Sequence, residues 1–182
     1  MRTLIACLLI SLNAFPLAAQ QPAAASLPGK AHAALALFAG DWDAQAKFWM
    51  WTDPSAPPME ATATVRAEMI MDGRFLLQKV QGQSMGKPLD AIGVIGYNNA
   101  TARYEAASFD NMGTSISRHV GEANDAGDIV LHLRYQDQAT GDTIDRRTVK
   151  ALVSTREWIE TAHETRNGVE RKVMEIRARR IR

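Results

Sequence analysis

The segment from Gly40 to Trp51 alternates between apolar and polar side chains, and this pattern most constrains how the chain can fold. A period of two is typical of a strand that buries one face and exposes the other. A glycine just before the large indole of Trp42 allows tight packing around it. The face predicted to be buried carries Trp42, Ala44, Ala46, Phe48 and Met50. We therefore expect the first strand of a sheet here.

Short segments of similar length follow, and turn signals separate them. The clearest signals are Asp72-Gly73 and Asn167-Gly168, because such pairs readily adopt the positive φ angles of a type I′ hairpin turn. No long helical pattern interrupts the series. Short connections favour an up-and-down meander, and closure removes its exposed edges. The sequence therefore predicts an all-β fold, an up-and-down antiparallel β-barrel of about ten strands.

Residues 1–19 have the pattern of a secretory signal peptide. Arg2 supplies the positive start, residues 4–12 are apolar, and small residues end at Ala19, the expected cleavage site. The apolar stretch is too short for a permanent membrane span. A lipoprotein-like box ends at Cys7, but too few apolar residues precede it to form a signal core. We therefore expect a periplasmic or secreted protein with no membrane span.

The rest of the chain is predicted to form one domain. Residues 20–29 are rich in Ala, Pro and Ser and are expected to be a disordered lead-in. Residues 30–182 are the predicted barrel, with a short helix over Lys30–Phe38 that Gly40 stops. The sole cysteine, Cys7, leaves with the signal peptide, so no disulfide is expected. The formal charge of +1 includes Arg2, so the mature chain is neutral, which argues against nucleic-acid binding.

Short motifs in a fixed order span nearly the whole chain after the leader. They are His32, Leu35, Leu37 and Gly40-x-Trp42; Asp72-Gly73-Arg74-Phe75; Met85-Gly86-x-Pro88; Gly93, Gly96-Tyr97 and Tyr104; Asp110-x-x-Gly113-Thr114; Gly121; Thr140-Gly141; and Met174-Glu175-Ile176. With these motifs the chain resembles the bacterial domain-of-unknown-function family 1579 (DUF1579), grouped with the calycin barrels, the lipocalins and fatty-acid-binding proteins. The resemblance implies a calycin-like β-barrel and no particular activity. One departure is Asn98, where the family pattern has an acidic residue, so we assign no chemistry to that position.

The same resemblance implies a structural role for Trp42. In lipocalins the tryptophan of the Gly-x-Trp motif packs beneath the barrel, and a basic side chain from the last strand lies across it. Arg177, Arg179 and Arg180 are the candidates in this chain. A guanidinium over an indole face gains about 0.5–2 kcal/mol. We therefore expect one of these arginines to cover Trp42.

No recognisable catalytic or metal-binding set is present in the sequence. His32, His119, His132 and His163 are not spaced as metal ligands, and the three strand histidines share parity with polar neighbours. They are therefore expected to point to solvent. The mature chain has no cysteine and no nucleophile elbow, so neither feature supports covalent catalysis. We predict no metal, no cofactor and no catalytic residue.

The inner face predicted for the barrel carries unusually small side chains. It carries Ala44, Ala46, Ala61, Ala63, Ala67, Ala91, Gly93 and Ala106. Protein interiors fill to the density of crystals, so such a wall must either collapse inward or leave room for a ligand. The leading hypothesis is an interior site for a small, partly apolar molecule. Its predicted lining residues are Tyr97, Tyr104, Arg118 and Phe48.

Two other classes of function remain open. An enzyme would place acid–base residues at the barrel mouth, with Asp110, Arg118 and His119 as candidates. A structural protein would use a packed barrel and pair with a partner or a second copy through Trp49 and Trp51. Those two tryptophans could equally lie beneath the proline-rich loop at residues 52–58. Binding without catalysis is the prediction we favour.

Overall fold

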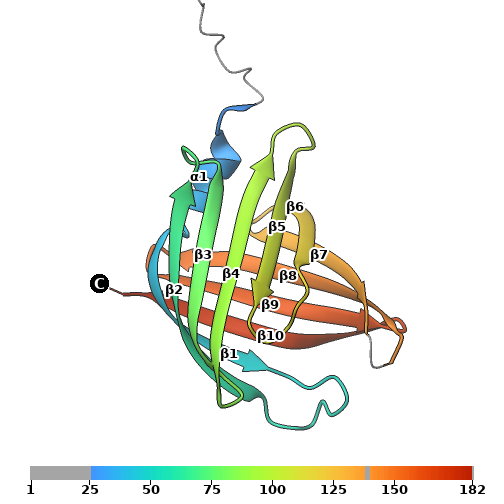
Figure 1. Cartoon of the computed structure of the whole chain (residues 1–182). Helices are drawn as coiled ribbons and strands as arrows, with labels where there is room; N and C mark the ends of the chain where they lie inside the picture. Colours follow the sequence, from blue (N-terminus) through green and yellow to red (C-terminus); the bar gives the residue numbers. More distant parts are fainter. Residues whose placement is uncertain (1–25, 138–139, 182) are drawn as a thin grey trace, which may run out of the picture.

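The structure, a computed structural model, describes residues 26–137 and 140–181, and within them the chain forms a ten-stranded closed antiparallel barrel with one short helix (Figure 1). The elements are α1 (Lys30–Ala36), β1 (Gly40–Phe48), β2 (Met59–Ile70), β3 (Phe75–Ser84), β4 (Lys87–Asn98), β5 (Arg103–Asp110), β6 (Ser117–Ala123), β7 (Ile129–Gln136), β8 (Thr143–Ser154), β9 (Glu157–Arg166) and β10 (Val169–Arg180). The predicted all-β barrel is confirmed. No helix among the described residues has the length and apolar character needed to cross a membrane. The predicted signal peptide lies outside the described residues.

Each strand pairs with the next along the chain, and β1 pairs with β10 to close the barrel. Both predicted hairpins are present, and their turn residues have positive φ angles. Asp72 and Gly73 have φ values of 55° and 81°, and Asn167 and Gly168 have 49° and 80°. Asn167-Gly168 is a two-residue connection of I′ type, since Arg166 pairs with Val169. The turn at Asp72-Gly73 is longer: residues 71–74 connect Ile70 to Phe75, and Met71 also has a positive φ of 51°. The turn chemistry therefore fixes where these two strand pairs reverse.

The first strand is shorter than its alternation predicts. It ends at Phe48, although the Trp49 N–H still donates to the carbonyl oxygen of Val173 at 3.0 Å. Beyond this bond the chain leaves the ladder for the segment that contains Pro54, Pro57 and Pro58, where pairing is interrupted. Met50, predicted to be buried, is 48% exposed as a result.

Helix α1 lies across one end of the barrel (Figure 1). Trp42 is fully buried in the same core cluster as Leu35 of this helix. The Trp42 indole N–H donates to the Phe38 carbonyl oxygen at 3.0 Å. The guanidinium carbon of Arg180 lies 4.1 Å from the centre of the Trp42 ring. The same guanidinium donates to the carbonyl oxygen of Ala39 at 2.8 Å. The predicted covering arginine is therefore Arg180, and it ties the last strand to the end of the helix.

A glycine is needed at position 40 for two reasons. Its φ of 132° lies outside the range that residues with a side chain favour. A Cβ atom at this position would also collide with the guanidinium of Arg180. The Gly-x-Trp motif thus makes room for the arginine that covers its tryptophan.

Candidate functional site

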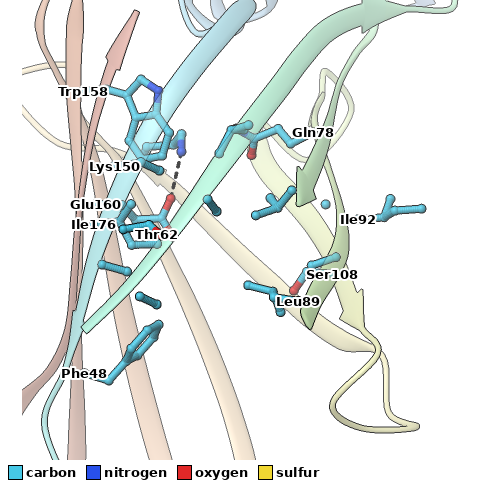
Figure 2. Close-up of a pocket in the computed structure, with 18 residues that line it drawn as sticks. Phe48, Thr62, Gln78, Leu89, Ile92, Ser108, Lys150, Trp158, Glu160 and Ile176 are labelled. Carbon is cyan, nitrogen blue, oxygen red and sulfur yellow. Dashed lines mark hydrogen bonds and ion pairs between the residues drawn. The ribbon is translucent and has the colours of Figure 1, made fainter. Parts of the chain in front are cut away.

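The barrel interior contains a cavity of about 210 Å³ between two unlike walls (Figure 2). Lys150, Trp158 and Glu160 lie together on one side of the view, whereas Gln78, Leu89 and Ser108 lie on the other. Phe48 lies toward the end away from Trp158. The cavity is therefore bounded by strands from both halves of the chain.

One wall is built of small apolar side chains from β1 to β4. Its members are Ala44, Ala46, Ala61, Ala63, Ala91 and Gly93. They lie at every second position of their strands, so the pleat turns all of them toward the interior. Ala44 pairs with Ala63, and Ala46 pairs with Ala61, so the small residues of β1 and β2 lie side by side. These small side chains leave the space that the sequence predicted, and the larger Phe48, Gln78 and Leu89 of the same four strands line the rest of this side.

The opposite wall carries a buried ion pair. Lys150 of β8 and Glu160 of β9 are direct cross-strand partners, and Lys150 Nζ lies 2.8 Å from Glu160 Oε2. The Lys150 residue is only 2% exposed. Its ammonium lies 3.6 Å from the ring centre of Trp158 and 5.4 Å from that of Phe38. A buried charge is tolerated only with such partners, so Glu160 and the two rings hold the ammonium in place.

A second polar cluster lies farther along the same two strands. Glu164, itself 4% exposed, accepts from the Tyr135 hydroxyl at 2.9 Å and pairs with Arg146 at 3.1 Å and Arg166 at 2.9 Å. Arg166 also pairs with Asp137 at 2.9 Å. Burial, followed by the hydrogen bond to Glu164, raises the pKa of Tyr135 to about 12. The cluster therefore keeps Tyr135 protonated as a donor.

His119 faces the barrel interior, contrary to the prediction that it points to solvent. Its neighbours Arg118 and Val120 are exposed, so the alternation of β6 turns His119 inward. Its Nδ1 atom is buried and has no hydrogen-bond partner. Burial lowers the pKa of His119, the positive charge of Arg146 lowers it further, and Glu160 acts in the opposite direction. Protonation of the imidazole is thus disfavoured in the fold relative to a histidine in water.

The other two strand histidines, His132 and His163, differ from each other in burial. His132 is exposed on the outer face, as predicted. His163 pairs across strands with Arg147 and Lys172, and burial followed by the charge of Arg147 lowers its pKa. Among residues 26–137 and 140–181, no three His, Cys, Asp or Glu side chains gather as a metal site would require.

Only one of the four predicted ligand-binding residues lines the interior cavity, whereas Tyr97 and Arg118 line a second, more open hollow. Phe48 lines the cavity. Tyr97 and Tyr104 stack edge to face at 5.0 Å, and Tyr97 also contacts the ring of His32 at 5.9 Å. This aromatic group lies at the α1 end and is absent from the cavity lining. Arg118 lies on the outer face and does not line the cavity either.

The candidates for other functions are also separated. Arg118 and His119 both line a second, more open hollow beside β6, but Asp110 does not line it, so the three candidates do not form one site. Trp49 lies beneath the Lys172 ammonium at 4.4 Å. Trp51 lies 5.0 Å from the guanidinium carbons of both Arg166 and Arg171. Both tryptophans therefore pack against cations of the barrel.

Lys150, Trp158 and Glu160 are among the lining residues that sequence reasoning missed. A usable signal was the tryptophan at position 158, because a large indole in a strand marks the inner face. Counting by twos from Trp158 reaches Glu160 and then Glu164, which reveals carboxylates inside the barrel. Strand β8 gives no such signal, since charged residues occupy both of its faces.

The comparisons with known proteins agree with this architecture. The family described as "Protein of unknown function (DUF1579)" matches residues 27–180. Comparison with curated proteins finds no match. The crystal structure of Rv2717c from M. tuberculosis is similar with a TM-score of 0.58 and 18% identity, over 85% of this chain and 99% of that one. The S-type phycobiliprotein lyase CPES from Guillardia theta is similar with a TM-score of 0.54 and 9% identity, over 81% and 90%.

At these identities the two structures show a shared fold. The family match carries more weight, because it covers nearly all of the described chain. It also agrees with the ordered motifs that run from His32 to Ile176. The chain therefore belongs to the DUF1579 family.

Proposed function

We propose that the barrel binds a small, partly apolar molecule in its interior. The observation that carries this proposal is the alanine-lined cavity of about 210 Å³. An apolar protein cavity of about 150 Å³ is large enough to bind benzene. A ligand here would bury its apolar part against β1 and β2 and gain about 25 cal/mol for each Å² removed from water. Its polar part would face Lys150 and Glu160.

The test has two parts. Native mass spectrometry of the purified chain should reveal a co-purified small molecule. Indole, a small apolar probe, should raise the melting temperature of the protein. Ala63→Leu fills the cavity and should abolish the indole effect, whereas Thr64→Leu places the same side chain on the outer face and should preserve it. A bare protein with no thermal shift from indole would refute the proposal.

We also propose that the protein acts outside the cytoplasm. The support is the pattern of residues 1–19, with Arg2 at the start, an apolar stretch and small residues up to Ala19. Cell fractionation followed by N-terminal sequencing should recover a chain beginning at Gln20 from the periplasm or the medium. An intact Met1 in the cytoplasmic fraction would contradict it.

A further inference from the structure

Lys150 differs from every other lysine of the chain in its surroundings. All six lysines lie within the described residues, and the other five are exposed. Lys150 alone lines the interior cavity. A lysine taken out of water can act as a nucleophile toward carbonyl compounds once its ammonium has given up a proton, and a neighbouring carboxylate can accept that proton.

We propose that Lys150 is a covalent attachment site for a small neutral aldehyde or ketone, which it holds as a protonated imine beside Glu160. This proposal rests on the proposed binding cavity and names the class of its ligand. Figure 2 shows the amine and the carboxylate in contact on the cavity wall, with Trp158 next to them. The reacting nitrogen and an acid–base partner are therefore already in place.

The charge of the cavity favours a neutral ligand over an anion. The ammonium of Lys150 is already matched by Glu160 at 2.8 Å, so the wall has no spare positive charge. A carboxylate ligand would meet the like charge of Glu160 in a desolvated site, which is costly. A carbonyl compound avoids this cost and lays its apolar part on the alanine wall.

The product keeps the interactions that now hold the lysine. A protonated imine carries the same single positive charge as the ammonium, in nearly the same place. Glu160 can still pair with it, and the Trp158 ring, 3.6 Å from Nζ in the free protein, still faces a cation. Formation of the adduct therefore leaves no buried charge without a partner.

The step balances without any further reactant. The Lys150 ammonium gives one proton to Glu160, and the freed lone pair attacks the carbonyl carbon, forming the C–N bond. Glu160 returns that proton to the carbonyl oxygen. A second proton then passes from the nitrogen through Glu160 to the hydroxyl group, which departs as water when the C–O bond breaks. An ammonium and a carbonyl compound thus become a protonated imine and water, and nothing is oxidised or reduced.

The test uses hexanal as the probe and sodium cyanoborohydride to trap any imine as a stable secondary amine. Peptide mass spectrometry then measures labelling of each lysine in the same molecule. Lys150 should be labelled about tenfold faster than any exposed lysine, because the cavity holds the aldehyde next to the amine. Labelling of Lys150 no faster than that of the exposed lysines would overturn the proposal.

Two variants separate the roles of the pair. Lys150→Met/Glu160→Met removes both charges together, so it leaves no unpaired buried charge, and only exposed lysines should then be labelled. Glu160→Gln keeps the amine and should slow labelling of Lys150 about tenfold relative to the exposed lysines, measured below its melting temperature. Unchanged labelling in Glu160→Gln would overturn the role of Glu160 as proton carrier.

Failure of this proposal can be distinguished from failure of the cavity proposal. If indole binds and Ala63→Leu abolishes its effect while Lys150 stays unlabelled, the cavity binds ligands but the covalent step is wrong. If indole has no effect and Lys150 is labelled no faster than the exposed lysines, both proposals are wrong.

Discussion

The two walls of the cavity have the same backbone and opposite chemistry. Strands β1 and β2 turn alanines inward, whereas β8 and β9 turn lysine, arginine and glutamate inward. Both walls are antiparallel ladders in one closed barrel. The difference therefore comes from side chains alone, and the fold does not dictate what the interior can bind.

The two walls are destabilised by burial for different reasons. The small residues leave part of the interior unfilled, so the wall loses packing contacts. The charged residues fill the interior but lose their hydration, and this loss must be offset by partners of opposite charge. On the charged wall the partners are direct neighbours: Lys150 lies opposite Glu160, and Arg146 lies opposite Glu164. A ligand between the walls would be oriented by this contrast.

The largest expected effect comes from breaking a buried pair on the charged wall. Glu164→Gln leaves Arg146 and Arg166 without their shared carboxylate, and we expect the free energy of unfolding to fall by about 3 kcal/mol. Urea denaturation measures it. The control Glu68→Gln changes an exposed glutamate and should cost less than about 0.5 kcal/mol. Equal losses in both variants would show that the charged wall has no special dependence on pairing.

The next effect tests whether the alanine wall has spare room. Ala178→Leu enlarges a fully buried alanine of β10 that packs in the core, and it should cost about 1–3 kcal/mol. Ala63→Leu adds the same atoms next to the cavity and should cost less than about 1 kcal/mol. Thermal and urea unfolding compare them. If Ala63→Leu were the more damaging change, the wall would be packed rather than open.

A smaller effect is expected at the seam where β10 meets β1. Arg180→Ala removes the contact with the Trp42 ring and the hydrogen bonds to the carbonyl oxygens of Ala39 and Thr155, so it should cost about 1–2 kcal/mol. Arg179→Ala, an exposed neighbour, should change stability by less than about 0.5 kcal/mol. Calorimetry of both variants decides the matter, and matching melting temperatures would show that Arg180 does not hold the seam.

The smallest effect is a pH dependence on the charged wall. Burial and Arg146 lower the pKa of His119 below its ordinary value of 6.5. Below pH 6.5, His119 of the unfolded chain binds a proton, whereas His119 of the folded chain still disfavours one. The free energy of unfolding is therefore undiminished by this group above pH 6.5 and falls as the pH falls below it. His119→Gln should therefore lose less stability than the wild type between pH 7 and pH 5, measured by urea unfolding. Parallel curves for the two proteins would contradict an interior neutral imidazole.

Much of the fold was predictable because its signals are local. The Asp72-Gly73 and Asn167-Gly168 turns depend only on the backbone freedom of their own residues. The buried face of the first strand followed from alternation around Trp42. The predicted end of that strand, Trp51, lies three residues beyond the observed end, Phe48. The alternation of side chains continues past Phe48, but after the hydrogen bond at Trp49 the chain leaves the ladder toward the prolines.

The site was predicted only in part. The alanine wall was expected, since small residues recur at every second position. Tyr97 and Tyr104 were predicted to line the ligand site as polar-tipped residues of the inner face. In the structure they contact each other, and Tyr97 contacts His32 of α1. His119 was placed outside because polar residues share its parity in the loop before β6, which begins at Ser117.

The sequence by itself determined the barrel, its two hairpin turns and the small side chains of its inner face, because these properties depend on single residues or on the alternation within one strand. That one of three arginines covers Trp42 was implied by the family resemblance. Only the tertiary structure decided that Lys150 meets Glu160 and that Arg180, rather than Arg177 or Arg179, reaches Trp42. Strand β8 carries charges on both faces, so the pairing register with β7 and β9 alone settles which charges enter the interior and what they face there.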